Sequence, residues 1–189
     1  PYQIPESGNQ VLSHRPVIAG FGPAGLFCAL LLARAGYHPL VLERGEDVDH
    51  RMASVERFWN TGILDTESNI QFGEGGAGTF SDGKLNTMVK DAFGRNHYVL
   101  KTFVDAGADP DILYVNKPHI GTDVLQAVVK QLRQEILSLG GEVRFGAKVT
   151  DLNIKDHRLC SIQINGTEEL PCEALILAIG HSARDTFSM

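Results

Sequence analysis

Three glycines near the start of the chain have the spacing of a phosphate-binding turn. Gly20, Gly22 and Gly25 form a Gly-x-Gly-x-x-Gly pattern between a short apolar run, residues 16–19, and a longer one, residues 24–35. Between a strand and a helix, the first glycine makes a tight turn, the second lets the backbone approach a diphosphate, and the third lets the helix pack on the strand. The free amides and the positive dipole end of the helix then favour an anion. This pattern predicts a dinucleotide site.

An acidic residue follows at the place where a ribose ligand is expected. Glu43 comes directly after a second apolar run, residues 39–42, and an acid there accepts hydrogen bonds from the adenosine ribose. The same negative charge disfavours a 2′-phosphate. Pro23 suits the first helical turn, where its missing N–H is not needed. We therefore predict that the glycines, Pro23, Ala24 and Glu43 bind the adenosine diphosphate part of a dinucleotide.

The surrounding pattern predicts the elements that position these residues. Residues 16–19, 24–35 and 39–42 read as strand, helix and strand, with Gly36 ending the helix, which is a βαβ unit with parallel strands. Further helices are predicted at 47–59, 94–107 and 122–139, an antiparallel meander at 142–145, 147–154, 158–164 and 168–171, and a last strand at 174–179. The predicted fold class is α/β, a Rossmann-like FAD/NAD(P)-binding domain with a parallel sheet and a small antiparallel β-meander.

Composition excludes several other classes of protein. The 189 residues include 17 Lys and Arg against 23 Asp and Glu, a net charge of −6 that argues against nucleic acid and anionic lipid as partners. No stretch approaches the ~18 apolar residues that span a membrane. Cys28, Cys160 and Cys172 lack paired spacing, so neither a metal site nor a disulfide framework is expected. These features predict a cytoplasmic protein without a metal.

The chain divides into a short lead-in and one domain. Residues 1–15 are polar and aperiodic and carry no candidate site. Residues 16–189 are expected to be the N-terminal part of a dinucleotide-binding domain. Because the sequence starts with Pro1 and ends at Met189 without a closing element, we expect a fragment of a longer protein.

A second glycine-rich segment indicates which dinucleotide binds. Residues 69–84 contain too many glycines for a regular element, at a point where an NAD domain would continue with βαβ alternation. Thr79, Ser81 and Asp82 add hydroxyl and backbone donors to this segment. This arrangement favours an extended cofactor such as a flavin dinucleotide.

Four segments resemble a family of bacterial flavoproteins. They are VIAGFGPAGLFCALLLARAGYHPLVLERG, SNIQFGEGGAGTFSDGKLNT, KPHIGTD and LILAIGHSARDTF, and the likeness runs from about Pro16 to Met189. The sequence is similar to bacterial uncharacterised FAD-dependent dehydrogenases, within the NAD(P)/FAD-dependent oxidoreductases that resemble glutathione reductase and fumarate reductase. The resemblance implies FAD as the cofactor, with Glu43 on its ribose.

The resemblance also assigns expected roles to further residues. It implies that the 73–85 loop passes near the flavin, that Arg44 and Arg51 lie near the adenine or the diphosphate, and that the backbone of Val149 contacts the adenine. In the strand-ending motif Ala178-Ile179-Gly180, isoleucine stands where threonine is more usual, so only backbone proximity is expected. The implied cofactor residues outside the first motif are Arg44, Arg51, Gly75, Gly76, Ala77, Gly78, Thr79, Val149, Ala178 and Gly180.

Residues that could take part in catalysis are few. Flavin chemistry needs few protein acids, because the flavin itself carries the electrons. Lys84, His119 and His181 are the candidates, and a histidine there could protonate a substrate or tune the reduced flavin. No Cys-x-x-Cys pattern supports a disulfide reductase.

The predicted function is an FAD-dependent oxidoreductase. It would transfer a hydride or electrons between FAD and a small-molecule substrate that the sequence does not identify, and NADH or NADPH is left open as a second partner. An NAD-dependent dehydrogenase and a non-catalytic FAD- or nucleotide-binding module are the alternatives. A flavoprotein acting on tRNA is a further alternative, which the acidic charge disfavours. Oligomeric state is not predicted.

Overall fold

Short strands form a parallel sheet at the centre of the fold. A computed structural model of the chain describes residues 2–9, 11–80, 83, 85, 90–115 and 118–189. The predicted βαβ unit is confirmed as β1 (Val17–Ala19), α1 (Pro23–Arg34) and β2 (Leu40–Leu42). Within the described residues, the parallel strands lie in the order β3-β2-β1-β7, with β3 (Glu142–Arg144) and β7 (Leu175–Leu177) at the edges.

The antiparallel meander is smaller than predicted. It consists of β4 (Val149–Lys155), β5 (Arg158–Ile164) and β6 (Glu168–Pro171). The prediction that residues 142–145 belong to it is wrong, because β3 pairs with β2 in parallel. The preceding helix returns the chain to the sheet edge, and a three-residue strand carries too little pattern to show which sheet it joins.

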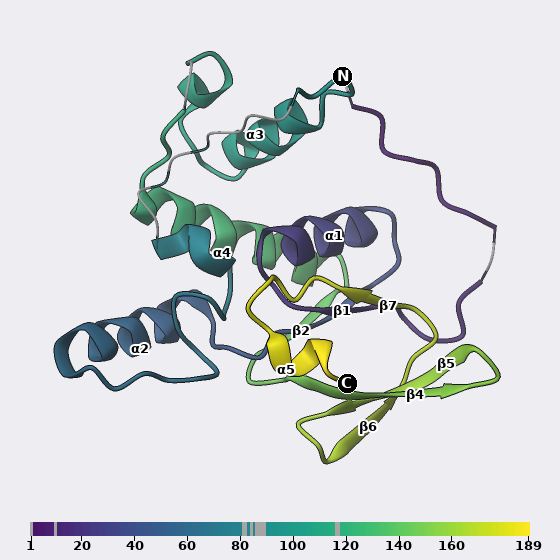
Figure 1. Cartoon of the computed structure of the whole chain (residues 1–189). Helices are drawn as coiled ribbons and strands as arrows, with labels where there is room; N and C mark the ends of the chain where they lie inside the picture. Colours follow the sequence, from purple (N-terminus) through teal and green to yellow (C-terminus); the bar gives the residue numbers. More distant parts are fainter. Residues whose placement is uncertain (1, 10, 81–82, 84, 86–89, 116–117) are drawn as a thin grey trace.

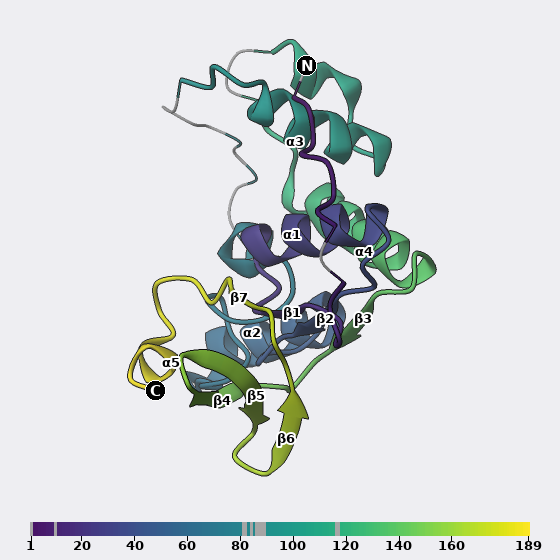
Figure 2. The ribbon, with the colours of Figure 1, turned by 90° about the vertical axis from the view of Figure 1, so that its right-hand side faces the viewer.

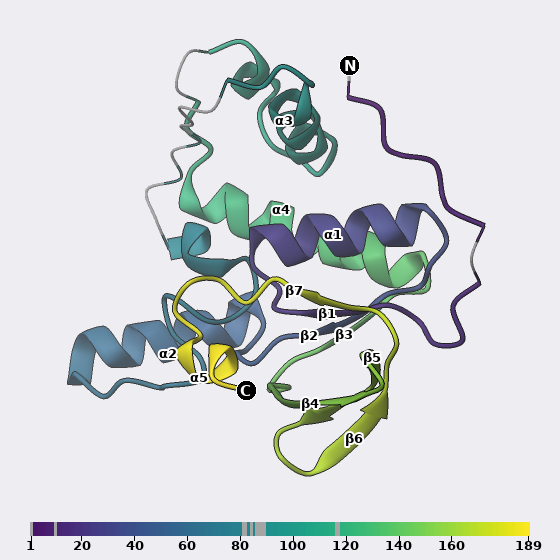
Figure 3. The same ribbon diagram turned by 45° about the vertical axis from the view of Figure 1, so that its right-hand side comes forward.

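Helices and the meander cover opposite faces of the parallel sheet. Figures 1, 2 and 3 show α1 and α4 (Thr122–Ser138) side by side over one face and β4, β5 and β6 on the other side. The alternation of side chains divides the core accordingly. Ile18 and Val41 pack toward the helices with Leu26, Leu30, Val128, Leu132 and Ile136. Val17, Ala19, Leu40 and Leu42 pack toward the meander with Val149, Ile162, Ile164 and Cys172.

The remaining elements surround this three-layer centre. They are α2 (Val48–Thr61), η1 (Gly76–Phe80), α3 (Arg95–Asp105), η2 (Pro110–Leu113) and α5 (Arg184–Phe187). The predicted helices at 47–59, 94–107 and 122–139 are confirmed as α2, α3 and α4. Asp47 caps α2 by accepting hydrogen bonds from the amides of Asp49 and His50 at 3.0 and 3.2 Å. In the part of the chain that the structure describes, no helix has the length and apolar character needed to cross a bilayer.

Candidate functional site

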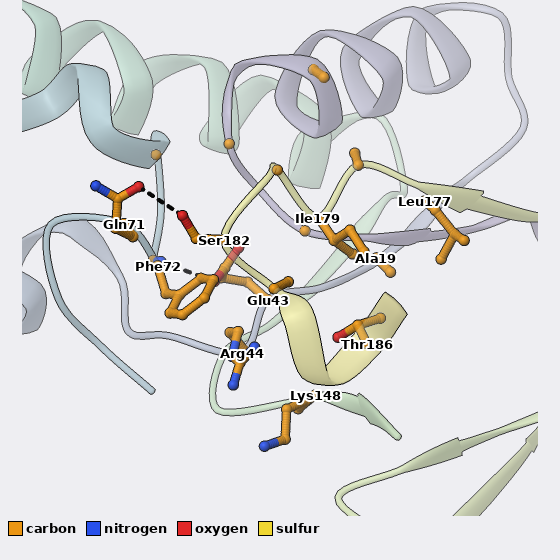
Figure 4. A pocket seen from close by; sticks show the side chains of 18 of the residues that line it. Ala19, Glu43, Arg44, Gln71, Phe72, Lys148, Leu177, Ile179, Ser182 and Thr186 are labelled. Atoms are coloured by element: carbon orange, nitrogen blue, oxygen red, sulfur yellow. Dashed lines mark hydrogen bonds between the residues drawn. The ribbon is translucent and has the colours of Figure 1, made fainter. Parts of the chain in front are cut away.

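A pocket of about 480 Å³ lies at the carboxyl ends of β1, β2 and β7, a size typical of ligand sites. In open α/β sheets, ligands bind at this edge. Predicted cofactor residues gather around the pocket: Gly20, Gly22, Pro23, Ala24, Glu43, Arg44, Gly76, Ala77, Val149, Ala178 and Gly180. Figure 4 shows the pocket between the first glycine turn, the 71–73 segment and α5.

The three glycines of the first motif have different physical roles. Gly20 has φ +99°, and a Cβ there would lie 2.5 Å from the carbonyl oxygen of Ala178. A Cβ on Gly25 would lie 1.9 Å from the carbonyl oxygen of Gly20, so both positions require glycine for packing. Gly22 is different, because its φ is −70° and a Cβ would meet only the Gly76 Cα, at 3.8 Å. The fold tolerates a side chain at Gly22, and the space that such a side chain would take lies in the pocket.

The start of α1 supplies amides suited to an anion. The first helical hydrogen bond runs from the Leu26 amide to the Gly22 carbonyl at 2.9 Å, so the amides before it have no intrahelical acceptor. Pro23 occupies the first turn, which contains no acidic side chain. Gly22, Pro23 and Ala24 all border the pocket. The positive end of the helix dipole therefore faces the pocket, where it favours negative charge.

Glu43 is buried at the edge of the same pocket with its carboxylate fixed by backbone amides. Its Oε2 accepts a hydrogen bond from the Phe21 amide at 2.6 Å, and its Oε1 accepts from the amides of Gly45 and Gly73 at 2.9 and 3.0 Å. An ionised carboxylate has about four acceptor positions. Three are used, which leaves about one for a ligand hydroxyl. The acid therefore also joins the first glycine turn to the second glycine-rich segment, which the sequence alone did not indicate.

The second glycine-rich segment packs directly on the first. The Gly75 amide donates to the Phe21 carbonyl at 2.9 Å, and a Cβ on Gly76 would lie 2.9 Å from the Pro23 Cδ. Gly76 and Ala77 border the pocket. Four other residues that were predicted to bind the cofactor do not border the pocket: Gly25, Gly75, Gly78 and Thr79. Ser81 and Asp82 lie outside the described residues.

Arg51 has a different place from the one expected for it. The side chain is fully buried and does not border the pocket. It holds the second glycine-rich segment by donating to five oxygens at 2.6–2.8 Å: the carbonyls of Asn69, Ile70, Glu74 and Gly76, and Oγ1 of Thr79. Burial lowers the pKa of Arg51 to about 10, opposed by the charges of Glu43 and Glu74. Arg51 is thus an internal support for the pocket wall rather than a group facing a ligand.

A buried acid and a partly buried arginine support the same wall. Glu74 is fully buried, and its Oε2 accepts from the Val48 amide at 2.9 Å and lies 3.3 Å from Nη1 of Arg133. Burial raises the pKa of the Glu74 carboxyl, while the Val48 amide and Arg133 act in the opposite direction. Sequence reasoning did not single out either residue, because the two are far apart in the chain and only the folded structure brings them together.

Among the candidate catalytic residues that the structure describes, His181 borders the pocket and His119 does not. His181 is exposed and borders it, with its Nε2 at 3.4 Å from Oγ of Ser182. His119 is exposed and does not border the pocket. Lys84 lies outside the described residues.

Several pocket residues were not expected from the sequence. Gln71, Phe72 and Lys148 border the pocket, as do residues 182–183 and 186–187 at the end of the chain. The Phe72 ring lies under the Arg44 guanidinium at 4.1 Å, and Ser182 Oγ donates to Gln71 Oε1 at 3.2 Å (Figure 4). These residues have no motif spacing, so no signal in the sequence could have placed them at the pocket.

A curated relative and several solved structures are similar to this chain. No family model matches it. It is 56% identical over 184 residues to an uncharacterized protein of Clostridium beijerinckii, an alignment that covers 97% of this chain and 34% of that protein. The chain therefore spans about a third of the length of the curated relative that it matches.

The similar solved structures establish the fold. Thermovibrio ammonificans THI4 matches with a TM-score of 0.56 at 19% identity, over 89% of this chain and 58% of that one. OTEMO, solved in complex with FAD and NADP, matches with a TM-score of 0.53 at 17% identity, over 89% and 26% of the two chains. A third similar structure is a 3-ketosteroid-Δ4-(5α)-dehydrogenase from Rhodococcus jostii RHA1, solved with 4-androstene-3,17-dione. It has a TM-score of 0.52 at 16% identity, over 86% of this chain and 45% of that one. The predicted Rossmann-like α/β fold class is thereby confirmed.

Proposed function

We propose that the pocket binds the adenosine diphosphate half of FAD and that the protein is an FAD-dependent oxidoreductase. The observation that carries this proposal is the convergence of the amide-bearing start of α1 and the Glu43 carboxylate on one pocket. The start of α1 favours an anion, and the Glu43 carboxylate favours a hydroxyl donor. A nucleoside diphosphate has both groups. Gly22 adds support, because it leaves room in the pocket that the fold itself does not need.

The donor set fits the ADP half of the cofactor. The amides at Gly22 and Ala24 would hold the diphosphate, the remaining acceptor position of Glu43 would take a ribose hydroxyl, and the backbone of Val149 would face the adenine. When bound, the flavin would accept and release the electrons, while the chain orients it and excludes water. The reaction in this proposal is hydride or electron transfer with a small-molecule substrate, and NADH or NADPH is a second partner of the complete enzyme.

Two observations favour FAD over NAD. The second glycine-rich segment lies directly against the first and contributes Gly76 and Ala77 to the pocket, where an NAD domain would have regular βαβ alternation. Among the solved structures with this fold, OTEMO was solved with FAD and NADP, which supports FAD as the proposed cofactor. Another is named a dehydrogenase, which supports the proposed class of reaction.

Titration with ADP, FAD and NAD by calorimetry tests the proposal. The chain should bind ADP and FAD, and Gly22→Ala should weaken both by about tenfold or more, because its methyl group occupies the space of the diphosphate. Gly8→Ala is the matched control, since a Cβ there also meets nothing close and Gly8 does not border this pocket. Circular dichroism should show unchanged folding of both variants.

Two results would contradict the proposal. One is the absence of ADP and FAD binding, and the other is equal binding by the wild-type chain and Gly22→Ala. Retention of NAD in preference to FAD would favour the NAD-dependent dehydrogenase instead.

A further inference from the structure

Two cationic side chains stand next to the acid at the ribose end of the pocket. Arg44 directly follows Glu43, and Lys148 directly precedes β4; both border the pocket (Figure 4). A cation beside the ribose acid is the kind of group that accommodates a 2′-phosphate in dinucleotide sites. From their positions alone, these two residues would make the pocket suitable for a 2′-phosphorylated nucleotide.

Both cations are already paired with acids. Arg44 donates from Nε to Oε2 of Glu67 at 2.9 Å, and from Nη1 and Nη2 to the two carboxylate oxygens of Asp185, each at 2.9 Å. Lys148 Nζ lies 3.1 Å from Oε1 of Glu67 and 3.4 Å from Oδ2 of Asp185. Each acid therefore contacts both cations. We call Arg44, Glu67, Lys148 and Asp185 the four-charge cluster, and its formal charge is zero.

The four-charge cluster is held in place by its surroundings. The Arg44 side chain is only 12% exposed and stacks over the Phe72 ring at 4.1 Å. The acids come from separate parts of the chain, Glu67 from the segment after α2 and Asp185 from α5. Ser182 adds a hydrogen bond to Gln71 between the same two segments at 3.2 Å. All three guanidinium nitrogens of Arg44 therefore donate to the two acids and do not point at a ligand in the pocket.

We propose that Glu67 and Asp185 determine nucleotide specificity by neutralising Arg44 and Lys148, so that the pocket accepts a ribose with a free 2′-hydroxyl and rejects a 2′-phosphate. This inference rests on the proposed dinucleotide site. Glu43 repels a 2′-phosphate directly, and the two further acids remove the cations that would offset this repulsion. The cluster would keep NADP-type dinucleotides out of a site meant for FAD.

The test compares ADP-ribose with 2′-phospho-ADP-ribose, two probes that differ only in the 2′-phosphate. Calorimetry on the wild-type chain should show at least about tenfold weaker binding of the phosphorylated probe. The double variant Glu67→Gln/Asp185→Asn releases both cations and keeps the side-chain shapes. The ratio of the dissociation constants of the two probes should then fall by about tenfold. High salt should reverse part of this gain, because the Lys148 side chain is 28% exposed and salt screens its interaction with the phosphate.

Charge-matched and reverting variants make the test specific. Glu56→Gln/Asp105→Asn removes the same net charge at exposed positions that do not border the pocket, and it should leave the difference between the probes unchanged. Adding Lys148→Met to the double variant should restore part of the discrimination. If circular dichroism shows that the double variant does not fold, Asp185→Asn alone is tested. The ratio of the two dissociation constants should then fall by about threefold.

The outcomes separate this inference from the proposed function. If the wild-type chain binds neither probe, the proposed function fails together with the inference. If ADP-ribose binds and the difference between the probes stays the same in the double variant, or changes equally in the charge-matched control, only the inference is overturned.

Discussion

Replacement of Arg51 by lysine should strongly destabilise the fold although the charge is kept. The guanidinium donates to five oxygens of the segment that forms one wall of the pocket. An ammonium group has three donors and no planar fork, so at least two acceptors lose their partner. Hydrogen bonds to charged groups contribute about 1.5–3 kcal/mol each, which predicts a loss of about 3–6 kcal/mol. Because the total free energy of unfolding of a protein is about 5–15 kcal/mol, this loss is a large fraction of it.

Urea unfolding followed by far-ultraviolet circular dichroism measures this loss. With a slope of about 2 kcal/mol per molar urea, the midpoint for Arg51→Lys should fall by about 1.5 M or more. Arg57→Lys is the control, because Arg57 lies on the same helix, is 54% exposed and pairs only loosely with Asp65 at 3.6 Å; its midpoint should move by less than about 0.3 M. Equal midpoints for the two variants would refute the role given to Arg51.

Three further variants or measurements test the packing, the ion pairs and the thiols. Gly25→Ala should cost about 3 kcal/mol and lower Tm by roughly 6–12 °C, because its Cβ overlaps the Gly20 carbonyl oxygen; a thermal melt within 2 °C of wild type would contradict this. The hydrogen bonds from Arg44 lower the pKa of Asp185 to about 2 from its ordinary value of 3.8, so the pair stabilises the fold above about pH 4 and this contribution is lost as the pH falls toward 2. Because the Asp185 side chain is 49% exposed, the contribution should stay below about 1 kcal/mol, and Asp185→Asn should flatten the fall in unfolding free energy over that range; identical pH profiles would argue against it. Cys160 is exposed, whereas burial raises the pKa of the other two thiols, so iodoacetamide at pH 8 should modify Cys160 first by mass spectrometry, and equal labelling of all three would be the contrary result.

Local sequence pattern was sufficient to predict the βαβ unit whose residues lie close together in the chain. Gly20, Gly22, Gly25 and Glu43 belong to one βαβ unit, and the geometry of that unit fixes where they meet. The spacing also predicted different roles for the three glycines: a tight turn at Gly20, room for a diphosphate at Gly22 and helix packing at Gly25. The contacts agree with this division, because Gly20 and Gly25 are required by contacts within the protein and Gly22 is not.

The features that were not predicted depend on contacts between distant segments. The family resemblance implied that Arg51 lies near the adenine or the diphosphate, but folding brings carbonyl groups from 69–76 around it. Its burial follows from those acceptors, which no helical periodicity reveals. The four-charge cluster likewise joins Arg44 to Asp185, 141 residues further along the chain. The strand β3 was assigned to the wrong sheet for the same reason, since its partner is β2.

A crystal structure of the chain with ADP would test the central claim most directly. The account predicts the diphosphate against the amides of Gly22 and Ala24 and a ribose hydroxyl within hydrogen-bond distance of the Glu43 carboxylate. ADP bound at another place, or in this pocket with its ribose away from Glu43, would contradict it.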